Sequence, residues 1–281
     1  MQNLKYMNTI GTMILYSTQC DKFIREIIKQ CKKFSTKICI ITTDKSFDGN
    51  DTQDEQKLKK LYDDYINDPI ISCIELEWSK DQIFPGRESY ELSMKNKNGW
   101  APGGWIKGWY GICRYTGFLN LKDETDYVLF LDSDEIVDGE RFNLWKSEEL
   151  NKYPNIEAFK FLNYWYLNDP TKQATSLEDS IVMIKSVNYP ENLFFTDAER
   201  HGMCNAKLNR LENITYQGIP IIHHYSYVRD KTALIGKMKN THGQDICNES
   251  EVLQSVEKIL SGIDIIHQYK YKSVNNCFNI Q

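Results

Sequence analysis

Apolar and polar positions along the first half of the chain follow a pattern of strands and helices. Residues 11–17 and 37–44 are short apolar runs of the kind that form buried strands. Residues 21–34 lie between them and begin with Asp21, a residue type that caps helices. The apolar side chains of this segment recur at helical spacing, at Phe23, Ile24, Ile27, Ile28 and Cys31. The pattern predicts a strand, a helix and a second strand.

The same alternation continues up to a strongly apolar strand. Residues 51–67 are charged and predict a helix, residues 69–78 predict a third strand, and residues 103–121 predict a long helix that leads into the run 127–131. Strands separated by helices indicate a mostly parallel sheet with right-handed crossovers. We therefore expect an α/β fold in which helices flank the sheet.

The second half of the chain has a mixed pattern. Three further strands are expected at 156–167, 180–186 and 219–228. Two helices are expected after them, at 230–240 and 249–260. The segment after Tyr269 has weak periodicity. We therefore expect this tail to be a docking arm or a disordered end. A length of 281 residues suits one domain, 1–230, followed by a C-terminal helical extension, 231–281.

Composition narrows the class of protein. The apolar runs are too short to span a bilayer, and the mean hydropathy is −0.54, so an integral membrane protein is not expected. The eight cysteines form no CxxC pair and no zinc-ligand spacing, which predicts reduced thiols. The N-terminal run lacks the features of a secretory signal, and we expect a cytoplasmic protein. A net charge of −5 creates no global attraction for nucleic acid.

The segment DYVLFLDSDEIVDGE (126–140) joins an apolar run to five carboxylates within nine positions. The run suits a central strand covered on both faces, and ligands of such sheets bind beyond the carboxyl ends of the strands. Asp132 and Asp134 stand at that end, and they project the same way if the backbone stays extended. Two such oxygen ligands make half of a divalent cation site. A turn rich in Asp and Ser, without a ligand, is the alternative.

Other catalytic motifs do not occur in the chain. The residues after Asp132 and Asp134 lack the ligand spacing and the final glutamate of an EF-hand. There is no Walker A sequence, no GxGxxG, no HExxH and no GxSxG. The sequence therefore contains no motif that predicts a phosphate-binding loop or a serine nucleophile.

These residues carry a resemblance to a known family. DYVLFLDSDEIVDG resembles the DxD segment of GT-A fold glycosyltransferases, particularly the family-2-like group, and GWYGICRYTGFLN (108–120) is similar to the helix that precedes it. The resemblance covers roughly residues 10–230. It implies a GT-A fold with a nucleotide-sugar half at about 10–140 and an acceptor half at about 141–230. The implied activity is metal-dependent transfer from a nucleoside-diphosphate sugar, a UDP-sugar, to a hydroxyl group.

The resemblance also implies residues that bind the donor. Arg114 takes the place of a basic residue that reaches the donor, with Lys107 on the same helical face. The usual Ala-Arg-Asn of the family is Cys113-Arg114-Tyr115 here, and a surface cation is the alternative for Arg114. The other implied donor contacts lie at strand ends, at Tyr16, Thr18, Asp44, Asp132 and Ser133. A turn residue is the alternative for Asp44.

Two adjacent histidines lie inside the apolar run IPIIHHYSYV (219–228). Neighbouring strand residues point to opposite faces, so one of His223 and His224 is expected to face the site. A hydrogen-bonded core histidine is the alternative. The segment HYSYVR is similar to a late segment of bacterial, phage and giant-virus enzymes of this group, which commonly complete the metal site with a histidine. His224 is the first metal-ligand candidate beside Asp132 and Asp134, His223 is the second, and the metal is Mn²⁺ or Mg²⁺.

An inverting transfer needs a carboxylate base near the acceptor hydroxyl. Asp197 follows an aromatic run and is the first candidate, and Asp179 is the second. A retaining enzyme would not use either residue in this way. The acceptor is a glycan, a protein, a small glycoside or a modified base in phage DNA.

Three other classes stay open at this point. A nucleotidyltransferase of similar fold would also need acidic metal ligands, but YSTQCDKF (16–23) lacks its Gly-rich loop. A metallophosphohydrolase would need Asp-x-His spacing, which the chain lacks. A sugar-binding module without catalysis is the last alternative.

Overall fold

The computed structural model describes residues 8–45, 53–79, 104–195, 200–205, 207–238 and 249–280. Within these ranges, no helix has the length and apolar character needed to cross a membrane.

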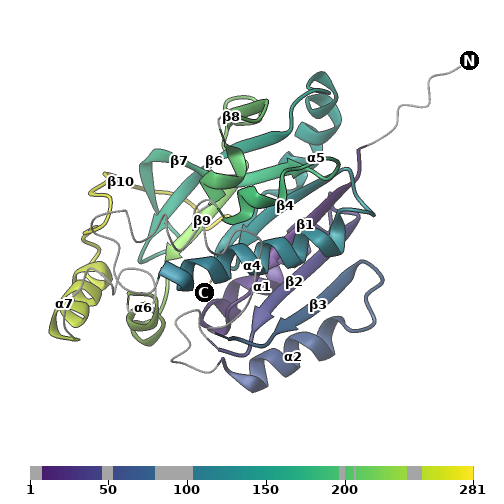
Figure 1. Cartoon of the computed structure of the whole chain (residues 1–281). Helices are drawn as coiled ribbons and strands as arrows, with labels where there is room; N and C mark the ends of the chain where they lie inside the picture. The colour runs from purple at the N-terminus through teal and green to yellow at the C-terminus, as the bar shows by residue number, and fades with distance from the viewer. Residues whose placement is uncertain are drawn as a thin grey trace, which may run out of the picture.

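The N-terminal half is a parallel sheet whose strands are joined by helices (Figure 1). Its elements are β1 (Ile10–Leu15), α1 (Asp21–Cys31), β2 (Lys37–Thr43), α2 (Glu55–Tyr65), β3 (Ile71–Leu76), α4 (Gly104–Leu121) and β4 (Tyr127–Asp132). The strands lie in the order β3, β2, β1, β4, and every neighbouring pair is parallel. Leu15 pairs with both Ile41 and Asp132, so the carboxyl ends of β1, β2 and β4 lie at one edge.

The C-terminal half extends the same sheet with mixed pairing. Its elements are β5 (Glu135–Val137), α5 (Gly139–Glu148), β6 (Ala158–Leu167), β7 (Lys172–Lys185), β8 (Arg210–Ile214), β9 (Ile222–Tyr227), α6 (Lys231–Lys237), α7 (Glu249–Leu260) and β10 (Tyr271–Ser273). Beyond β4 the order continues with β7, β6, β9 and β5, while β8 pairs with β6 and β10 with β7. Antiparallel pairs enter at β7, where it pairs with β4.

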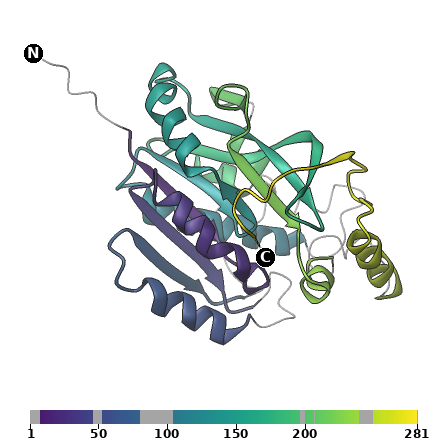
Figure 2. The same cartoon turned by 180° about the vertical axis from the view of Figure 1, so that it is seen from behind.

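Alternating side chains of the strands build two cores, one on each face of the sheet. On one face, Ile14 and Leu129 pack in the core that α1 and α5 cover (Figure 2). On the other face, Met13 and Phe130 pack in the core that α4 covers (Figure 1). This period-2 division of fully buried residues explains why β1 and β4 are apolar at nearly every position.

A third cluster holds the C-terminal extension against the sheet. Leu234 of α6 and Val256 of α7 pack with Trp165 and Leu167 of β6. The extension is helical over α6 and α7, and the tail after Tyr269 then forms β10. β10 pairs antiparallel with β7, so the tail is ordered as part of the sheet.

The predicted α/β fold, with a mostly parallel sheet flanked by helices, is confirmed. The structure adds one α-helix, α5, and three strands, β5, β8 and β10, that the pattern did not predict.

Candidate functional site

The candidate site lies at the edge where β1 and β4 end side by side. The chain leaves β4 through Asp132, Ser133 and Asp134, and the amide of Ser17, just beyond β1, donates a hydrogen bond to Ser133 Oγ at 3.3 Å. The amide of Tyr16 donates to Ile41 O at 2.8 Å, which ties the end of β1 to β2. The structure therefore brings the predicted donor-binding positions of β1 and the DxD segment to the same edge.

The strand that carries the histidine pair lies directly beside the DxD segment. β5 pairs antiparallel with β9, with Glu135 opposite His224, and the amide of Tyr225 donates to Asp134 O at 2.8 Å. As a result, His224 Nε2 lies 3.5 Å from Asp134 Oδ1 and 3.9 Å from Glu135 Oε1. The structure thus brings together Asp132, Asp134 and His224, which sequence reasoning grouped as metal-ligand candidates.

Positively charged side chains surround the Asp134 carboxylate. Arg229 Nη2 lies 2.6 Å from Oδ2, and Lys237 Nζ lies 3.3 Å from the same oxygen. Burial by itself would raise the pKa of Asp134, but Lys237, a hydrogen bond from His224 and Arg229 hold that pKa well below its usual range. Asp134 is therefore ionised, and its Oδ1 atom faces His224.

Asp132 is held by two arginines from other elements. Arg114 of α4 donates to Oδ1 at 3.3 Å, and Arg200 Nη2 lies 3.7 Å from Oδ2. Burial opposes the charge of Asp132, but Arg200 and Arg114 lower its pKa overall. Its side chain remains 29% exposed, in contrast to that of Asp134 at 6%. Asp132 is therefore the carboxylate of the pair that an incoming ligand reaches from solvent.

Glu135 and Arg200 form a buried ion pair beneath Asp132. Arg200 donates from both terminal nitrogens to the two oxygens of Glu135 and also to Phe130 O at 3.1 Å. Glu135 Oε2 in turn accepts the amide of Asp132 at 2.8 Å. This pair fixes the turn between β4 and β5. Sequence reasoning missed both residues as parts of the site, although Glu135 belongs to the carboxylate run that drew attention to it.

His224 is a buried imidazole among carboxylates. Burial lowers the pKa of His224, but a hydrogen bond to Asp134 and the charges of Asp134 and Glu135 raise it above its ordinary value. The ring packs edge-on against Trp165 at 4.6 Å, and Nδ1 makes no hydrogen bond to any residue that the structure describes. The raised pKa favours the protonated form of the ring, which carries a positive charge beside these carboxylates.

His223, the second metal-ligand candidate, lies on the opposite face of β9. Its Nδ1 shares a hydrogen bond of 2.7 Å with the Tyr166 hydroxyl. Burial lowers the pKa of His223 to about 4, so the ring is neutral. This position argues against His223 as a ligand at the DxD segment, and the physical reason is the period-2 geometry of the strand.

The predicted donor-binding residues just beyond β1 and β2 are held by local contacts. The Tyr16 hydroxyl donates to Asp21 Oδ1 at 2.7 Å, and the Thr18 amide and hydroxyl both donate to Gln53 Oε1. Asp44 accepts the amide of Trp78 at 2.7 Å, which joins the ends of β2 and β3. Each residue lies at the carboxyl edge of the sheet.

The remaining predicted residues have varied positions. Lys107 lies on α4, and its side chain is outside the described part of the structure. Asp197, the first base candidate, lies outside the described residues. Asp179, the second, is on β7 and forms an ion pair with Lys160 at 3.0 Å. A free carboxylate base would require this pair to open.

The candidate metal ligands are of residue types that bind divalent cations. Asp132 and Asp134 offer carboxylate oxygens and His224 offers Nε2, and the 3.5 Å between Asp134 Oδ1 and His224 Nε2 allows both atoms to bind one ion. Among the described residues, no group of three or more His, Cys, Asp or Glu side chains is already arranged to hold a metal. Arg229 and Lys237 compensate the charge of Asp134 instead.

Comparison with known proteins gives remote likenesses only. No family model matches the sequence, and no curated protein matches it. Glucosyl-3-phosphoglycerate synthase from Mycobacterium tuberculosis, solved with Mn²⁺, uridine diphosphate and phosphoglyceric acid, aligns at 12% identity over 64% of this chain and 56% of that chain, with a TM-score of 0.33. The apo-form glycosyltransferase GlyE of Streptococcus pneumoniae aligns at 13% identity over 91% of this chain and 63% of that chain, with a TM-score of 0.39.

A third solved structure is similar to this chain to the same low degree. The bifunctional glycosyltransferase WbbM in its apo form aligns at 11% identity over 87% of this chain and 52% of that chain, with a TM-score of 0.38. In each of the three comparisons, the aligned part is less than two thirds of the solved chain. These scores are too low to carry an argument about this chain, and the assignment below rests on its own residues.

Proposed function

We propose that this chain is a metal-dependent glycosyltransferase of GT-A type that moves a sugar from a nucleoside-diphosphate sugar, a UDP-sugar, to a hydroxyl acceptor. The observation that carries the proposal is the pairing of β5 with β9, which brings His224 next to Asp134 at the carboxyl edge of β1 and β4. The resemblance of residues 126–139 to a DxD segment supports the same function.

The charges of the site suit an anionic donor. Four cationic side chains, Arg114, Arg200, Arg229 and Lys237, lie within ion-pair distance of three carboxylates, Asp132, Asp134 and Glu135. The excess of positive charge favours a diphosphate, and buried arginines bind phosphate oxygens well. In this proposal Tyr16, Thr18, Asp44 and Ser133 contact the nucleotide, and Lys107 and Arg114 reach the diphosphate.

In this proposal Asp132, Asp134 and His224 hold the divalent cation, Mn²⁺ or Mg²⁺. When bound, such an ion neutralises the negative charge that develops on the leaving diphosphate. Arg229 and Lys237 then lie where they stabilise the same charge, since both already point at Asp134. Arg200 acts indirectly, because it fixes Glu135 and with it the turn that presents Asp132 and Asp134.

The reaction inverts configuration in this proposal. A carboxylate removes the proton of the acceptor hydroxyl as the sugar bond forms. Asp197 is the first candidate and Asp179 the second. The acceptor is a glycan, a protein, a small glycoside or a modified base in DNA, and the reaction takes place in the cytoplasm. We assign residues 1–230 to the catalytic domain and 231–281 to the extension.

A screen of nucleotide sugars with Mn²⁺ that measures released nucleotide tests the function. We expect one donor to be turned over, and we expect chelation and Asp134→Asn each to reduce the rate to background. Asp63→Asn is the matched control, because Asp63 pairs with Lys59 at the surface of α2. Full activity in chelator would remove the metal from the mechanism, and activity of Asp134→Asn equal to that of Asp63→Asn would refute the site.

The base is tested separately from the donor site. Asp197→Asn should lower the transfer rate by about 100-fold while nucleotide binding is retained, since general-base catalysis has that scale. If Asp179→Asn is the inactive variant instead, the order of the two candidates is wrong. If both variants keep the wild-type rate, neither carboxylate is the base, and a retaining mechanism is favoured.

A further inference from the structure

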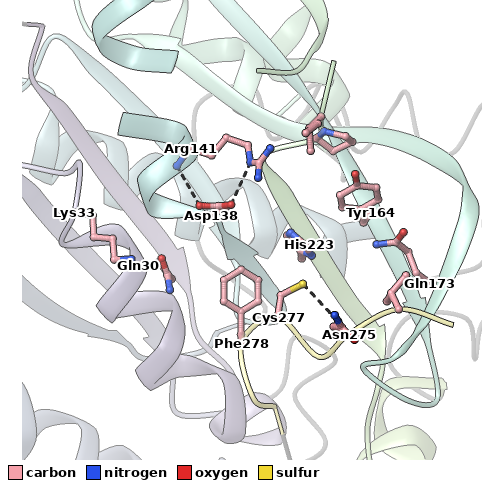
Figure 3. Close-up of a pocket in the computed structure, with 13 residues that line it drawn as sticks. Gln30, Lys33, Asp138, Arg141, Tyr164, Gln173, His223, Asn275, Cys277 and Phe278 are labelled. Carbon is pink, nitrogen blue, oxygen red and sulfur yellow. Dashed lines mark hydrogen bonds and ion pairs between the residues drawn. The ribbon is translucent and has the colours of Figure 1, made fainter. Parts of the chain in front are cut away.

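A second pocket, of about 490 Å³, lies on the α1 and α5 side of the sheet (Figure 3). Its floor is β9 at His223, its walls are α1, the start of α5, and β6 and β7, and the C-terminal segment 274–278 lies along its front. His223 points into this pocket, and its neighbour His224 points to the opposite face of β9, toward Asp134. The sheet therefore separates this pocket from the proposed donor site.

The floor of the pocket presents a buried hydrogen-bond donor. Gln173 Nε2 donates to the Tyr166 hydroxyl at 2.8 Å, and the Tyr166 hydroxyl lies 2.7 Å from His223 Nδ1. In the tautomer in which the Tyr166 hydroxyl donates to Nδ1, the neutral imidazole carries its own proton on Nε2. His223 is only 7% exposed, and Nε2 has no hydrogen-bond partner among the described residues. A ligand acceptor in the pocket would satisfy it.

Two more polar groups of the pocket wall are available to a ligand. The Tyr164 hydroxyl and the Asn275 side-chain amide line the pocket, and neither makes a hydrogen bond to a residue in the described ranges. The hydroxyl donates and accepts, and the amide offers an acceptor oxygen and donor hydrogens. The pocket therefore offers both kinds of hydrogen-bonding group, as a ligand with several hydroxyls requires.

Aromatic rings stand around the same floor. The Tyr164 ring lies 5.1 Å from the His223 ring, and the Phe278 ring meets it edge-on at 5.0 Å. Rings in such positions offer an apolar surface to the C–H face of a ligand while the polar groups take its hydroxyls. The pocket has the size of ordinary small-molecule sites.

Each charged residue that lines the pocket forms an ion pair. Asp138 pairs with Arg141 at 3.1 Å, and Lys33 pairs at 3.1 Å with Glu140, which lies outside the lining. No excess of positive charge remains for a phosphate, in contrast to the site at Asp134. The charges thus favour an uncharged ligand over a nucleotide.

We propose that this pocket binds a neutral saccharide, one or two sugar rings in size, as a second carbohydrate site separate from the donor site. The paired charges, the mixture of donors and acceptors, and the aromatic rings together suit a sugar ring, which has hydroxyls at its edge and C–H groups on its faces. The proposal does not depend on the proposed catalytic function, because a sugar-binding module would use the same pocket.

Saturation-transfer NMR with glucose, galactose, mannose, N-acetylglucosamine, maltose and lactose tests the proposal on the full chain. At least one of these sugars should bind, uridine diphosphate should not displace it, and Tyr164→Ala should weaken binding at least tenfold. Asp134→Asn is the control for the other face and should bind the sugar as the wild type does. Binding of none of the sugars, or displacement by uridine diphosphate, would overturn the proposal.

Cys277 gives an independent measurement at the rim of the pocket. It lines the pocket and its thiol is exposed, whereas Cys20, Cys31 and the other described cysteines are buried or partly buried. In a Cys247→Ser background, alkylation of Cys277 should slow at least threefold when the bound sugar is present. The protection should disappear in Tyr164→Ala. An alkylation rate that the sugar leaves unchanged would contradict binding at this pocket.

Discussion

Asp134 is a buried carboxylate held in place by two cationic side chains and an imidazole. Arg229, Lys237 and the imidazole of His224 all contact its two oxygens. Removal of a charge from water costs several kcal/mol, and partners must offset that cost. The cationic partners and a divalent metal therefore compete for the same carboxylate, and Lys237, at 14% exposed and on a flexible stem, is the partner that is easiest to displace.

This competition gives a prediction for Lys237. In Lys237→Met, Mn²⁺ should bind about tenfold more tightly when no nucleotide is present, because one charge-assisted hydrogen bond to Asp134 is worth about 1.4 kcal/mol. Calorimetry or Mn²⁺ paramagnetic resonance measures the change. The control is Lys231→Met on the same helix, since Lys231 pairs with Glu257 at the surface. Mn²⁺ binding that is equal in the two variants would show that Lys237 does not compete.

His223 gives a prediction for the pH dependence of stability. Its pKa of about 4 in the folded chain lies below the ordinary value of 6.5, mainly because of burial, with Asp138 and Arg141 as the nearest charges. Between these values the unfolded chain binds the proton and the folded chain does not, so the stability from His223 is present above pH 6.5 and is lost as pH falls toward 4. The loss is about 3 kcal/mol.

Urea unfolding of the wild type and His223→Gln between pH 4 and pH 7 measures this contribution. The difference in unfolding free energy between the two proteins should change by about 3 kcal/mol over that range, in the direction that makes the wild type relatively weaker at pH 4. Carboxylates such as Asp134 titrate in both proteins and cancel in the difference. A difference that stays constant with pH would mean that His223 is not buried in its neutral form.

Residues of the candidate site were predictable where the alternation of side chains along one strand determines which way they point. Asp132 and Asp134 follow an apolar strand, and alternation separated His224 from His223, so the structure brings together the ligand candidates that the sequence grouped. Arg200 and Arg229 were not predictable as neighbours of these carboxylates, because each reaches the site through folding of distant segments. No local pattern marks a buried arginine.

At the scale of elements, the segments with clear apolar spacing were predictable, whereas α5 and three short strands were not. α1 and β4 lie where the apolar spacing predicted them. β5 has three residues, and it is a strand only because β9 pairs with it. β10 depends in the same way on β7. The sheet thus confers strand structure on segments that lack a pattern of their own.

Helix α4 presents Arg114 to Asp132, and a glycine allows its close approach to neighbouring elements. A Cβ atom at Gly111 would lie 2.6 Å from the carbonyl oxygen of Phe194 and 2.9 Å from the Phe195 ring. Gly111→Ala should therefore destabilise the protein by about 2 kcal/mol, despite the higher helix propensity of alanine, because a backbone carbonyl cannot move aside. Thermal or urea unfolding measures this loss.

The same substitution should also affect the site. A displaced α4 moves Arg114 away from Asp132, so nucleotide binding should weaken along with stability. Leu119→Ala is the control on the outer face of the same helix, where the leucine is 40% exposed, and it should change stability by no more than about 0.5 kcal/mol. If Gly111→Ala is as stable as the wild type, then α4 does not depend on this contact.

At the scale of the whole molecule, one sheet separates the proposed donor site from the second pocket. β9 presents His224 to the carboxylate cluster and His223 to the second pocket. Lys237 of α6 contacts Asp134 of the DxD segment on the first face, while residues of α1, α5 and the C-terminal tail share one core on the second. A change confined to the second face should therefore leave nucleotide binding on the first face intact.

Deletion of residues 274–281 tests this division. The tail buries Ile280, at 7% exposed, in the core that α1 covers, and it places Phe278 against His223. Loss of both side chains should lower the unfolding free energy by about 3 kcal/mol, the scale of two partly buried apolar residues. The pKa of His223 should rise from about 4 toward its ordinary value, because the ring becomes less buried.

NMR titration of the histidines measures this rise in the pKa of His223. Binding of uridine diphosphate on the opposite face should stay within twofold of the wild type. Loss of nucleotide binding in a folded deletion variant would show that the two faces are coupled, and an unchanged His223 pKa would show that the tail does not cover the pocket.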